Sequence, residues 1–348
     1  MPVELGAEFV HGRPQATLDL LAAAGIPGVE STRTQQLLWR GRLRAVNAFA
    51  EAQKATRGPS TFKDVSFSDF LQRKKLSPLT RRLATMMVQG FDAADPAEAS
   101  ARDIVGEWAD ALQASQMRPQ GGYGPLLEFL SQGVDIRLRA PVREIRWRRG
   151  AVEAGGLRAR KAILTLPLGV LQSGDVAFSP GIGKERALAQ LAAGPVIRVA
   201  MHFREAFWER RCPGVAFFHA PQAPFPTFWT PLPMRAPLLT AWAGGPKASA
   251  MTGASRKQLL TLALRSVRSV FGKIPAPVAS LVQDWAADPR ARCGYSYVKV
   301  GGQRARAALR RPLEGTLHFA GEATSSDEGG TVGGALASGL RAARECLN

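Results

Sequence analysis

The C-terminal region of this 348-residue chain contains its most informative stretch, Leu317-His318-Phe319-Ala320-Gly321-Glu322-Ala323-Thr324, followed by Gly329-Gly330-Thr331-Val332-Gly333-Gly334-Ala335. The pattern predicts a strand, a glycine-rich turn and the first turn of a helix. Free N–H groups and the helix dipole at such a point stabilise an electron-rich or anionic ligand group, and the Glu322 carboxylate could accept hydrogen bonds from a sugar or polyol. The alternative is that the small residues four apart, from Gly330 to Ser338, only allow close helix packing, and the local pattern favours neither.

Upstream of this stretch, helical and strand patterns alternate. Residues 15–116 carry mainly helical signals, among them Ser77-Pro78 as an N-cap with proline at the first helical position. After a glycine-rich turn at 121–124, short strands around Gly150 are typical of a β-meander. The mixture is α+β, and two discontinuous domains fit it better than two in succession. The expected strands are 135–138, 142–147, 151–154, 161–166, 196–203, 215–219, 238–242 and 316–320, and the helices expected after residue 116 are 125–132, 184–191, 255–271 and 331–347.

The composition is that of a folded globular protein, with 45% hydrophobic and 21% charged residues, which excludes disordered and collagen-like classes. The net charge of +18 bears on partners. However, no basic run is longer than Arg73-Lys74-Lys75 and no nucleic-acid-binding motif is present, so a nucleic-acid- or membrane-surface-binding protein is a less favoured class. Three cysteines without C-x-x-C spacing argue against a disulfide framework, and no metal site is expected.

Two segments bear on location. The charge-free segment 212–234 is long enough to cross a bilayer, but it contains six prolines, which would break a spanning helix. The N-terminus has neither a basic region nor an apolar region of signal-peptide type. We therefore expect a cytoplasmic protein without a transmembrane segment.

A regular dinucleotide-binding fingerprint, G-x-G-x-x-G between a strand and a helix, does not occur in the sequence. Gly122-Tyr123-Gly124 lacks the third glycine, and the glycines at 329–334 have the wrong spacing. Any nucleotide site must therefore be recognised from other motifs.

Several motifs, taken in order, resemble the flavin-containing amine oxidase family of the monoamine and polyamine oxidase type. The block from Phe319 to Gly339 is similar to that family's C-terminal FAD motif, and Leu5–Gly12 resembles its early flavin-facing stretch. The matches keep the family's order and cover nearly the whole chain. The other matching segments are 121–123, 141–145, 165–169, 203–208, 285–289 and 294–297.

The resemblance implies a domain organisation. An α/β-type FAD-binding domain, here incomplete, would comprise residues 1–24, 119–175 and 290–348. It would be interleaved with a substrate-binding domain, a mixed sheet with helices, comprising residues 25–118 and 176–289.

The resemblance also implies the site residues. The Val142 backbone would meet the adenine of FAD, Glu322 would lie near the ribityl–pyrophosphate, and the amides of Thr331 and Val332 would point at the flavin C2 carbonyl. A partial positive charge there stabilises the anionic reduced flavin. The remaining cofactor-binding positions are Gly6, Ala7 and Gly321, and the catalytic positions are Arg198, Trp285 and Tyr295, although for Trp285 ordinary core packing is an equal alternative.

Three positions depart from the family's pattern. The family commonly has a lysine that holds a water against flavin N5, and the matching residue here is Arg198, whose planar fork cannot copy a compact ammonium. Whether Arg198 acts in catalysis or points elsewhere from its strand stays open. Thr331 replaces one wall of the aromatic cage of monoamine oxidases. Gly294 stands where some members tether the flavin through cysteine, so FAD is expected to bind non-covalently.

The start of the chain is a further departure. In the family a G-x-G-x-x-G βαβ unit precedes the stretch that matches Leu5–Gly12, and this sequence begins at Met1 after that point. The resemblance therefore predicts that the N-terminal dinucleotide-binding unit is missing. A start assigned too far downstream, a separate chain that supplies the unit and a degenerate gene are the three explanations. An exposed sheet edge would make the fragment prone to aggregation.

The function that the resemblance implies is FAD-dependent oxidation of an amine or amino-acid C–N bond, once the missing part is supplied. Hydride would pass from the substrate α-carbon to flavin N5, the imine would hydrolyse, and dioxygen would yield peroxide. The alternatives are a flavin-dependent desaturase or oxidase of an apolar substrate, and an inactive fragment. The positive charge would disfavour long cationic polyamines by long-range steering, unless a local acidic patch reverses that effect.

Overall fold

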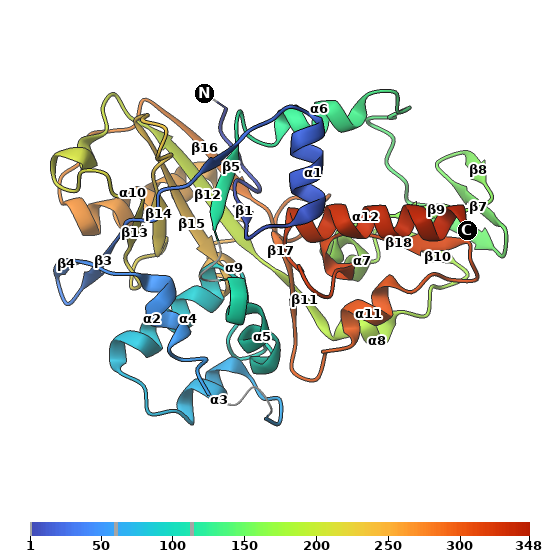
Figure 1. Ribbon diagram of the computed structural model, residues 1–348, viewed down its shortest axis with the longest axis horizontal. Coiled ribbons are helices and arrows are strands. Elements are labelled where there is room, and N and C mark those ends of the chain that lie inside the picture. Colours follow the sequence, from blue (N-terminus) through green and yellow to red (C-terminus); the bar gives the residue numbers. More distant parts are fainter. Residues whose placement is uncertain (1, 59–61, 112–114) are drawn as a thin grey trace.

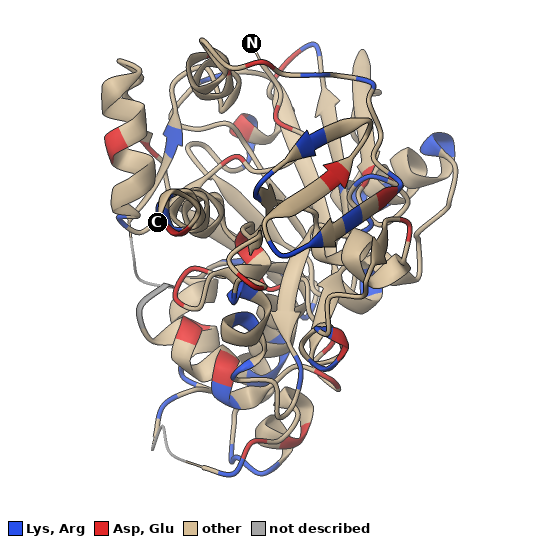
Figure 2. Ribbon diagram, turned by 90° about the vertical axis from the view of Figure 1, so that its right-hand side faces the viewer, with Lys and Arg blue, Asp and Glu red and all other residues tan. Residues whose placement is uncertain are grey.

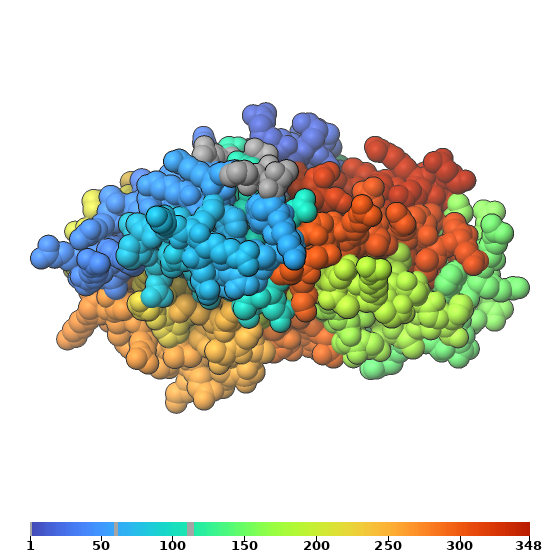
Figure 3. Space-filling model, turned by 90° about the horizontal axis from the view of Figure 1, so that it is seen from below, coloured from blue at the N-terminus to red at the C-terminus, as the bar shows by residue number. Residues whose placement is uncertain are grey.

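The protein's structure is a computed structural model that describes residues 2–58, 62–111 and 115–348. Two lobes lie side by side, one built on the largest sheet and one around the C-terminal helix α12 (Figure 1). Seen from below, cyan, lighter blue and light orange parts of the chain gather on one side, and green, red and darker orange parts gather on the other (Figure 3). Each lobe therefore combines segments that are far apart in the sequence, and the predicted domain boundaries stay a prediction.

The largest sheet has seven strands in the order β16-β12-β15-β14-β13-β3-β4. All neighbouring strands are antiparallel except β13 and β3, which are parallel. On the central strand β12 (Val196–His202), Ile197 and Val199 face the main hydrophobic core, so the alternation of a strand turns Arg198 to the opposite face. The other strands are β3 (Gln35–Trp39), β4 (Arg42–Ala45), β13 (Phe217–His219), β14 (Thr227–Trp229), β15 (Leu238–Gly244) and β16 (Ala279–Asp284).

Helices cover this lobe on two sides. Helix α10 (Arg256–Phe271) confirms the helix predicted at 255–271. It begins with a full capping box at Ser255, Gly272 is its C-cap, and its apolar face packs on the core of the sheet. A second core lies among the helices between β4 and β5, and the predicted N-cap at Ser77 is confirmed there, because its hydroxyl accepts from the Thr80 amide. These helices are α2 (Ala48–Gln53), α3 (Phe67–Gln72), α4 (Pro78–Gly90) and α5 (Ala101–Ala111); a short α9 (Gly245–Ser249) follows β15.

Small sheets surround helix α12 (Val332–Leu347) in the second lobe. They are the antiparallel sheet β1-β5-β2, the meander β6-β7-β8 with β10 added in parallel, the antiparallel pair β11-β17 and the parallel pair β18-β9. Their bounds are β1 (Val10–His11), β2 (Gly28–Glu30), β5 (Gln116–Pro119), β6 (Glu144–Arg148), β7 (Ala151–Ala154), β8 (Leu157–Ala159), β9 (Ala162–Leu164), β10 (Ala177–Ser179), β11 (Leu191–Gly194), β17 (Tyr295–Val298) and β18 (Leu317–Phe319). The remaining helices are α1 (Gln15–Ala23), α6 (Gly124–Ser131), α7 (Leu168–Ser173), α8 (Glu185–Ala189) and α11 (Ala305–Arg310), with 3₁₀ turns η1 (Phe207–Arg210) and η2 (Glu322–Thr324).

Two sequence-based expectations are wrong. Residues 15–116 are not mainly helical throughout, because β2 to β5 lie within or at the end of that range. Residues 135–138 form no strand, although Val134, Ile136 and Leu138 alternate with polar residues and are 58, 54 and 82% exposed. A strand needs a ladder partner for its backbone groups, and no described strand pairs with this segment.

Charged residues are dispersed along the chain, and basic residues gather on the meander that faces the viewer in Figure 2. Arg146, Arg148 and Arg158 are exposed there. None of the described helices combines the length and the apolar character needed to cross a membrane. The charge-free segment 212–234 contributes β13 and β14 to the large sheet, as its prolines predict.

Candidate active site

A cavity of about 1310 Å³ lies where the large sheet meets the N-terminal end of α12. It is larger than a typical small-molecule pocket of roughly 300–1,000 Å³. Nine of the ten predicted site residues line it: Gly6, Ala7, Arg198, Trp285, Tyr295, Gly321, Glu322, Thr331 and Val332. Val142 does not line the cavity and packs instead against the core beneath the meander.

A shared ion pair forms one wall of the cavity. The guanidinium of Arg198 donates to the Gly6 carbonyl at 2.9 Å and to the Glu8 carboxylate. Arg118 donates to the other oxygen of Glu8 at 2.7 Å, and Trp229 Nε1 donates to Glu8 at 3.1 Å. The Arg198, Glu8 and Arg118 side chains are only 2, 13 and 11% exposed. Glu8 is therefore the buried counter-ion of two guanidiniums.

The charges of this cluster are fixed at neutral pH. Burial by itself raises the pKa of Glu8, but the charges of Arg198 and Arg118 and their hydrogen bonds outweigh burial and hold the pKa below its ordinary value. The Nε of Arg198 is buried and has no hydrogen-bond partner among the described residues. The structure thus places Arg198 at the cavity as a permanent charge tied to Glu8.

Two predicted aromatic residues stand on either side of this region. Trp285 follows β16 and donates from Nε1 to the Leu5 carbonyl at 2.8 Å, so it fastens the N-terminal segment to the sheet. Tyr295 begins β17 and donates to the Phe91 carbonyl at 2.5 Å. Burial and then the nearby carboxylates raise the pKa of Tyr295 well above its ordinary value, so it remains a neutral phenol.

Four aromatic side chains, which we call the aromatic wall, form an apolar side of the cavity: Phe9, Phe217, Trp229 and Trp242. Phe9 lies 5.9 Å from Trp229 and 6.1 Å from Phe217, and Trp229 lies 5.8 Å from Trp242, measured between ring centroids. These distances are those of favourable tilted aromatic pairs. The wall can hold the hydrocarbon part of a ligand.

Three further carboxyl groups line the cavity: Asp103 and Glu107 on α5, and Asp92 in the connection between α4 and α5. We call these three the α5 carboxylates. Asp103 and Glu107 are four residues apart on α5 and share a face of that helix, and Asp92 accepts from Trp108 Nε1 at 3.1 Å. Burial raises the pKa of Glu107 to about 7, with a further contribution from Asp103 and an opposing one from Arg306. The pKa of Asp92 also lies well above its ordinary value, through burial and the neighbouring Glu107.

The charge of the cavity contrasts with that of the chain. Among the residues that the structure describes, seven carboxylates and four arginines line the cavity, whereas the whole chain carries +18. Burial and then Arg33 lower the pKa of the cavity histidine His11 to about 4, so His11 adds no charge. The cavity therefore holds carboxyl groups that could attract a cation at short range, and one of them, Glu107, becomes charged as the pH rises through about 7.

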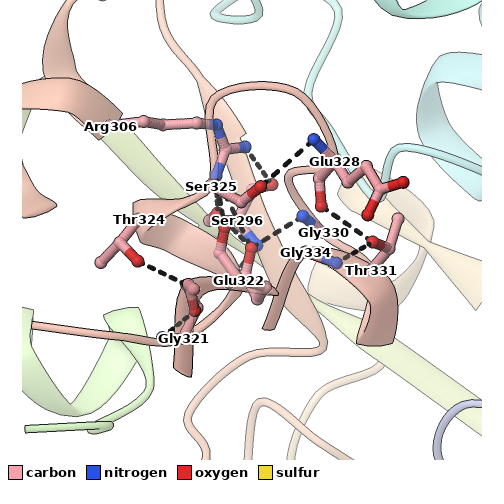
Figure 4. A network of polar contacts seen from close by, with 11 residues as sticks. Ser296, Arg306, Gly321, Glu322, Thr324, Ser325, Glu328, Gly330, Thr331 and Gly334 are labelled. Atoms are coloured by element: carbon pink, nitrogen blue, oxygen red, sulfur yellow. Dashed lines mark hydrogen bonds and ion pairs between the residues drawn. The ribbon is translucent and has the colours of Figure 1, made fainter. Parts of the chain in front are cut away.

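The glycine-rich C-terminal stretch is held by the network in Figure 4. Glu322 accepts from the Ser296 amide at 3.1 Å, from the Ser296 hydroxyl at 2.6 Å and from the Gly330 amide at 2.9 Å. Thr331 caps α12, accepting from the Gly334 amide at 2.9 Å and donating to the Glu328 carbonyl at 2.8 Å. The Glu322 carboxylate is thus a clamp within the protein, and its predicted place near a ribityl–pyrophosphate stays a prediction.

The first turn of α12 presents donors to the cavity. The N–H groups of Val332 and Gly333 find no acceptor among the described residues, as is usual for the first turn of a helix. Both residues line the cavity. The glycines thus allow close packing, and the helix end borders the cavity, while its role in binding a ligand stays a prediction.

Sequence reasoning missed several of these residues. Glu8 lies inside the stretch Leu5–Gly12 but gave no signal of its own, because its role depends on two arginines 110 and 190 positions away. The spacing of Ser100 and Asp103 in the sequence is that of a capping box and indicates only a helix start; in the structure the Asp103 amide donates to the Ser100 hydroxyl at 3.1 Å. Nothing in the local pattern around Arg306 distinguished it from the other arginines.

Comparisons with known proteins agree with this picture. The family model described as "flavin containing amine oxidoreductase" matches residues 4–347. Lysine-specific histone demethylase 2 of Homo sapiens is 33% identical over 240 residues, which is 64% of this chain and 29% of that protein. Polyamine oxidase 4 of Oryza sativa subsp. japonica is 27% identical over 390 residues, which is 99% of this chain and 79% of that protein. The chain thus spans less than a third of the demethylase.

Solved structures share the fold. A putrescine oxidase bound to putrescine matches with a TM-score of 0.82 and 20% identity, covering 99% of this chain and 88% of that one. Cyclohexylamine oxidase from Brevibacterium oxydans matches with a TM-score of 0.79 and 17% identity over the same shares. At these identities the likeness concerns the fold alone.

Proposed function

Because the chain belongs to the family of flavin-containing amine oxidoreductases, we propose that it binds FAD non-covalently in the cavity and oxidises a cationic amine at its C–N bond. When bound, FAD supplies the acceptor for a hydride from the carbon next to the nitrogen, and dioxygen regenerates it. The residues of the chain bind and orient FAD and the amine, and they supply charged groups around both.

The residues at the α12 end of the cavity fit an electron-rich ring system. The free N–H groups of Val332 and Gly333 suit a carbonyl or anionic edge. On the opposite side, Gly6 and Ala7 offer backbone without bulky side chains, and Trp285 packs beside Gly6. These residues would hold the flavin, and Arg198 would add a fixed positive charge beside it.

The rest of the cavity suits the amine. The aromatic wall can take the hydrocarbon chain, and the α5 carboxylates can attract an ammonium group. Among the relatives and structural neighbours are polyamine oxidases, a putrescine oxidase and a cyclohexylamine oxidase. We therefore place a small alkyl diamine or polyamine ahead of amino acids as the substrate class.

The observation that carries this proposal is the meeting of three features in one cavity: free N–H groups at a helix end, an aromatic wall, and carboxylates within a strongly basic protein. A desaturase of an apolar substrate would have no use for the α5 carboxylates. This is the reason for preferring amine oxidation.

The test is to incubate the purified chain with FAD, remove free FAD by gel filtration, and record the flavin absorbance that remains. Peroxide formation is then followed with 1,4-diaminobutane, spermidine, cyclohexylamine and a panel of amino acids. We expect retained flavin and the highest rates with the diamine or the polyamine. Absence of bound flavin would overturn the proposal, and activity confined to amino acids would overturn the substrate class.

A further inference from the structure

Arg306 on α11 is a buried charge outside the set of predicted site residues. Its side chain is 10% exposed, and its two terminal nitrogens donate to the Ser296 hydroxyl at 2.7 Å and to the Ser296 carbonyl at 3.0 Å. One of them also reaches the Glu322 carbonyl at 3.3 Å and lies 3.6 Å from the Glu322 carboxylate. A buried arginine with this many acceptors is oriented rather than mobile.

The contacts of Arg306 lead through Glu322 to the start of α12. The Ser296 hydroxyl accepts from Arg306 and donates to Glu322, and Glu322 in turn accepts from the Gly330 amide (Figure 4). Gly330 is the last residue of the segment Ser325–Gly330, which we call the entry loop of α12. Arg306 therefore fixes the loop whose end sets the direction of the first helical turn.

The entry loop also packs directly on the guanidinium. A Cβ built at Gly329 would lie 2.5 Å from Cζ of Arg306. Only glycine allows the loop to lie this close to the guanidinium. The loop and Arg306 thus fit each other in shape as well as in hydrogen bonding.

We infer that Arg306 is a positioning residue: through Ser296 and Glu322 it holds the entry loop so that the free N–H groups of Val332 and Gly333 face the cavity. The inference rests on the proposed function for the identity of the ligand, FAD. It adds a residue of the cavity lining whose effect on the cofactor passes through Ser296 and Glu322. Arg306 also acts on Asp103 and Glu107, since its charge opposes the burial that raises the pKa of both carboxyl groups.

The experiment compares wild type with Arg306→Met, Glu322→Gln and the double variant, and with Arg310→Met as control, because Arg310 is exposed on the same helix. The dissociation constant of FAD is measured by quenching of flavin fluorescence. We expect each single variant to weaken binding about tenfold, the loss typical of a charge-assisted hydrogen bond. The double variant should bind FAD about as tightly as the single variant with the lower affinity, because both substitutions break the same chain of contacts.

Two further readouts separate positioning from a general loss of structure. The midpoint potential of bound flavin should fall in Arg306→Met and recover in part in Arg306→Lys, since the helix end stabilises the reduced, anionic form. Gly329→Ala, which displaces the guanidinium without removing its charge, should behave like Arg306→Met. Unchanged FAD affinity in Arg306→Met, or losses that add in the double variant to about a hundredfold, would overturn the inference.

Hydrogen exchange measured on the protein without FAD tests the role of Arg306 independently of whether the protein binds FAD. Arg306→Met, or the milder Ser296→Ala where the methionine variant does not fold, should speed exchange at the Gly330 and Gly334 amides, while Arg310→Met should not. If the wild-type protein binds no FAD, the proposed function is wrong, and the role of Arg306 is then tested by the hydrogen-exchange rates alone. Unchanged exchange at these two amides overturns that role.

Discussion

At the scale of single residues, the ion pairs of Glu8 are buried, and we expect them to matter more for stability than exposed ion pairs do. Glu8 sits between Arg198 and Arg118, with all three side chains largely buried. Removing one member of such a cluster leaves uncompensated charge in a poorly solvated place, which costs far more than loss of an exposed pair. The geometry accordingly assigns Arg198 a fixed electrostatic role.

We predict that Glu8→Gln lowers the free energy of unfolding at pH 7 by about 3–5 kcal/mol, as for a broken buried ion pair, measured by urea denaturation. Glu205→Gln, at the exposed pair with Arg210, is the control and should change it by less than about 1 kcal/mol. Because the folded-state pKa of Glu8 is lowered, its contribution is present above its unfolded-state pKa and is lost as the pH falls through the folded value. An equal effect of the two substitutions would contradict the cluster's role.

Glu107 gives a second prediction at this scale. Its pKa of about 7 means that the cavity gains a negative charge as the pH rises through neutrality. KM for a cationic amine should therefore fall between pH 6 and pH 8, roughly a unit on either side of that pKa. In Glu107→Gln, KM should stay high and vary little. A KM profile in Glu107→Gln that still follows the wild-type curve would show that another group is responsible.

Glu107 also makes the stability of the protein depend on pH: ionisation of Glu107 favours binding of a cation but disfavours the folded state. Because the folded-state pKa of Glu107 is raised, its contribution to stability is present below its unfolded-state pKa and is lost as the pH rises through about 7. Glu107→Gln should therefore be more stable relative to wild type at pH 8 than at pH 5. Urea denaturation at the two pH values measures this difference.

At the scale of elements, the start of α12 is held by contacts of its first turn. Thr331 caps the helix and Gly334 lies against the Glu328 carbonyl, so the entry loop folds back on the helix end. Further along, Ser338 bonds to the backbone of Gly321. The helix therefore joins its own entry loop to the turn after β18.

We predict opposite effects for two glycine substitutions in α12. A Cβ at Gly334 would lie 2.0 Å from the Glu328 carbonyl oxygen, so Gly334→Ala must displace the helix start and should weaken FAD binding by at least tenfold, about 1.4 kcal/mol. A Cβ at Gly339 meets nothing within 4 Å. Gly339→Ala should therefore leave FAD binding unchanged and raise stability by about 0.5–1 kcal/mol through helix propensity. Equal FAD affinity in the two variants would refute this account.

At the scale of the whole molecule, the charge of the protein and that of its cavity have opposite effects on a cation. The chain as a whole repels a cation at long range, whereas the carboxylates in the cavity attract it at short range. Salt screens interactions between distant exposed charges more than those between partly buried ones. Ionic strength should therefore separate the two effects.

We predict that kcat/KM for 1,4-diaminobutane rises when the ionic strength is raised from about 0.01 M to 0.15 M, as the Debye length falls from roughly 30 Å to 8 Å. The monocation of cyclohexylamine should show a smaller rise, because it carries half the charge. Initial rates of peroxide formation at fixed pH measure both. A decrease with salt for the diamine would mean that the local carboxylates dominate at long range as well.

Much of the fold was accessible from the sequence because it is encoded locally. The N-cap at Ser77, the helix at 255–271, the strand and helix around the glycine-rich stretch, and the meander depend on neighbours a few residues away, and the structure confirms them. The strand expected at 135–138 failed for the opposite reason. Its alternation of apolar side chains is a local property, but a strand exists only where a second strand takes its hydrogen bonds.

The sequence by itself determined the family resemblance, the α+β class and nine residues that line one cavity. The tertiary structure decided which charges meet in that cavity. Glu8 pairs with Arg118 and Arg198, Arg306 bonds to Glu322 through Ser296, and the α5 carboxylates line the same cavity as the end of α12. Ion pairs and hydrogen bonds act over a few ångströms in space whatever the separation in sequence. A basic chain can therefore hold an acidic cavity, and only the folded arrangement reveals it.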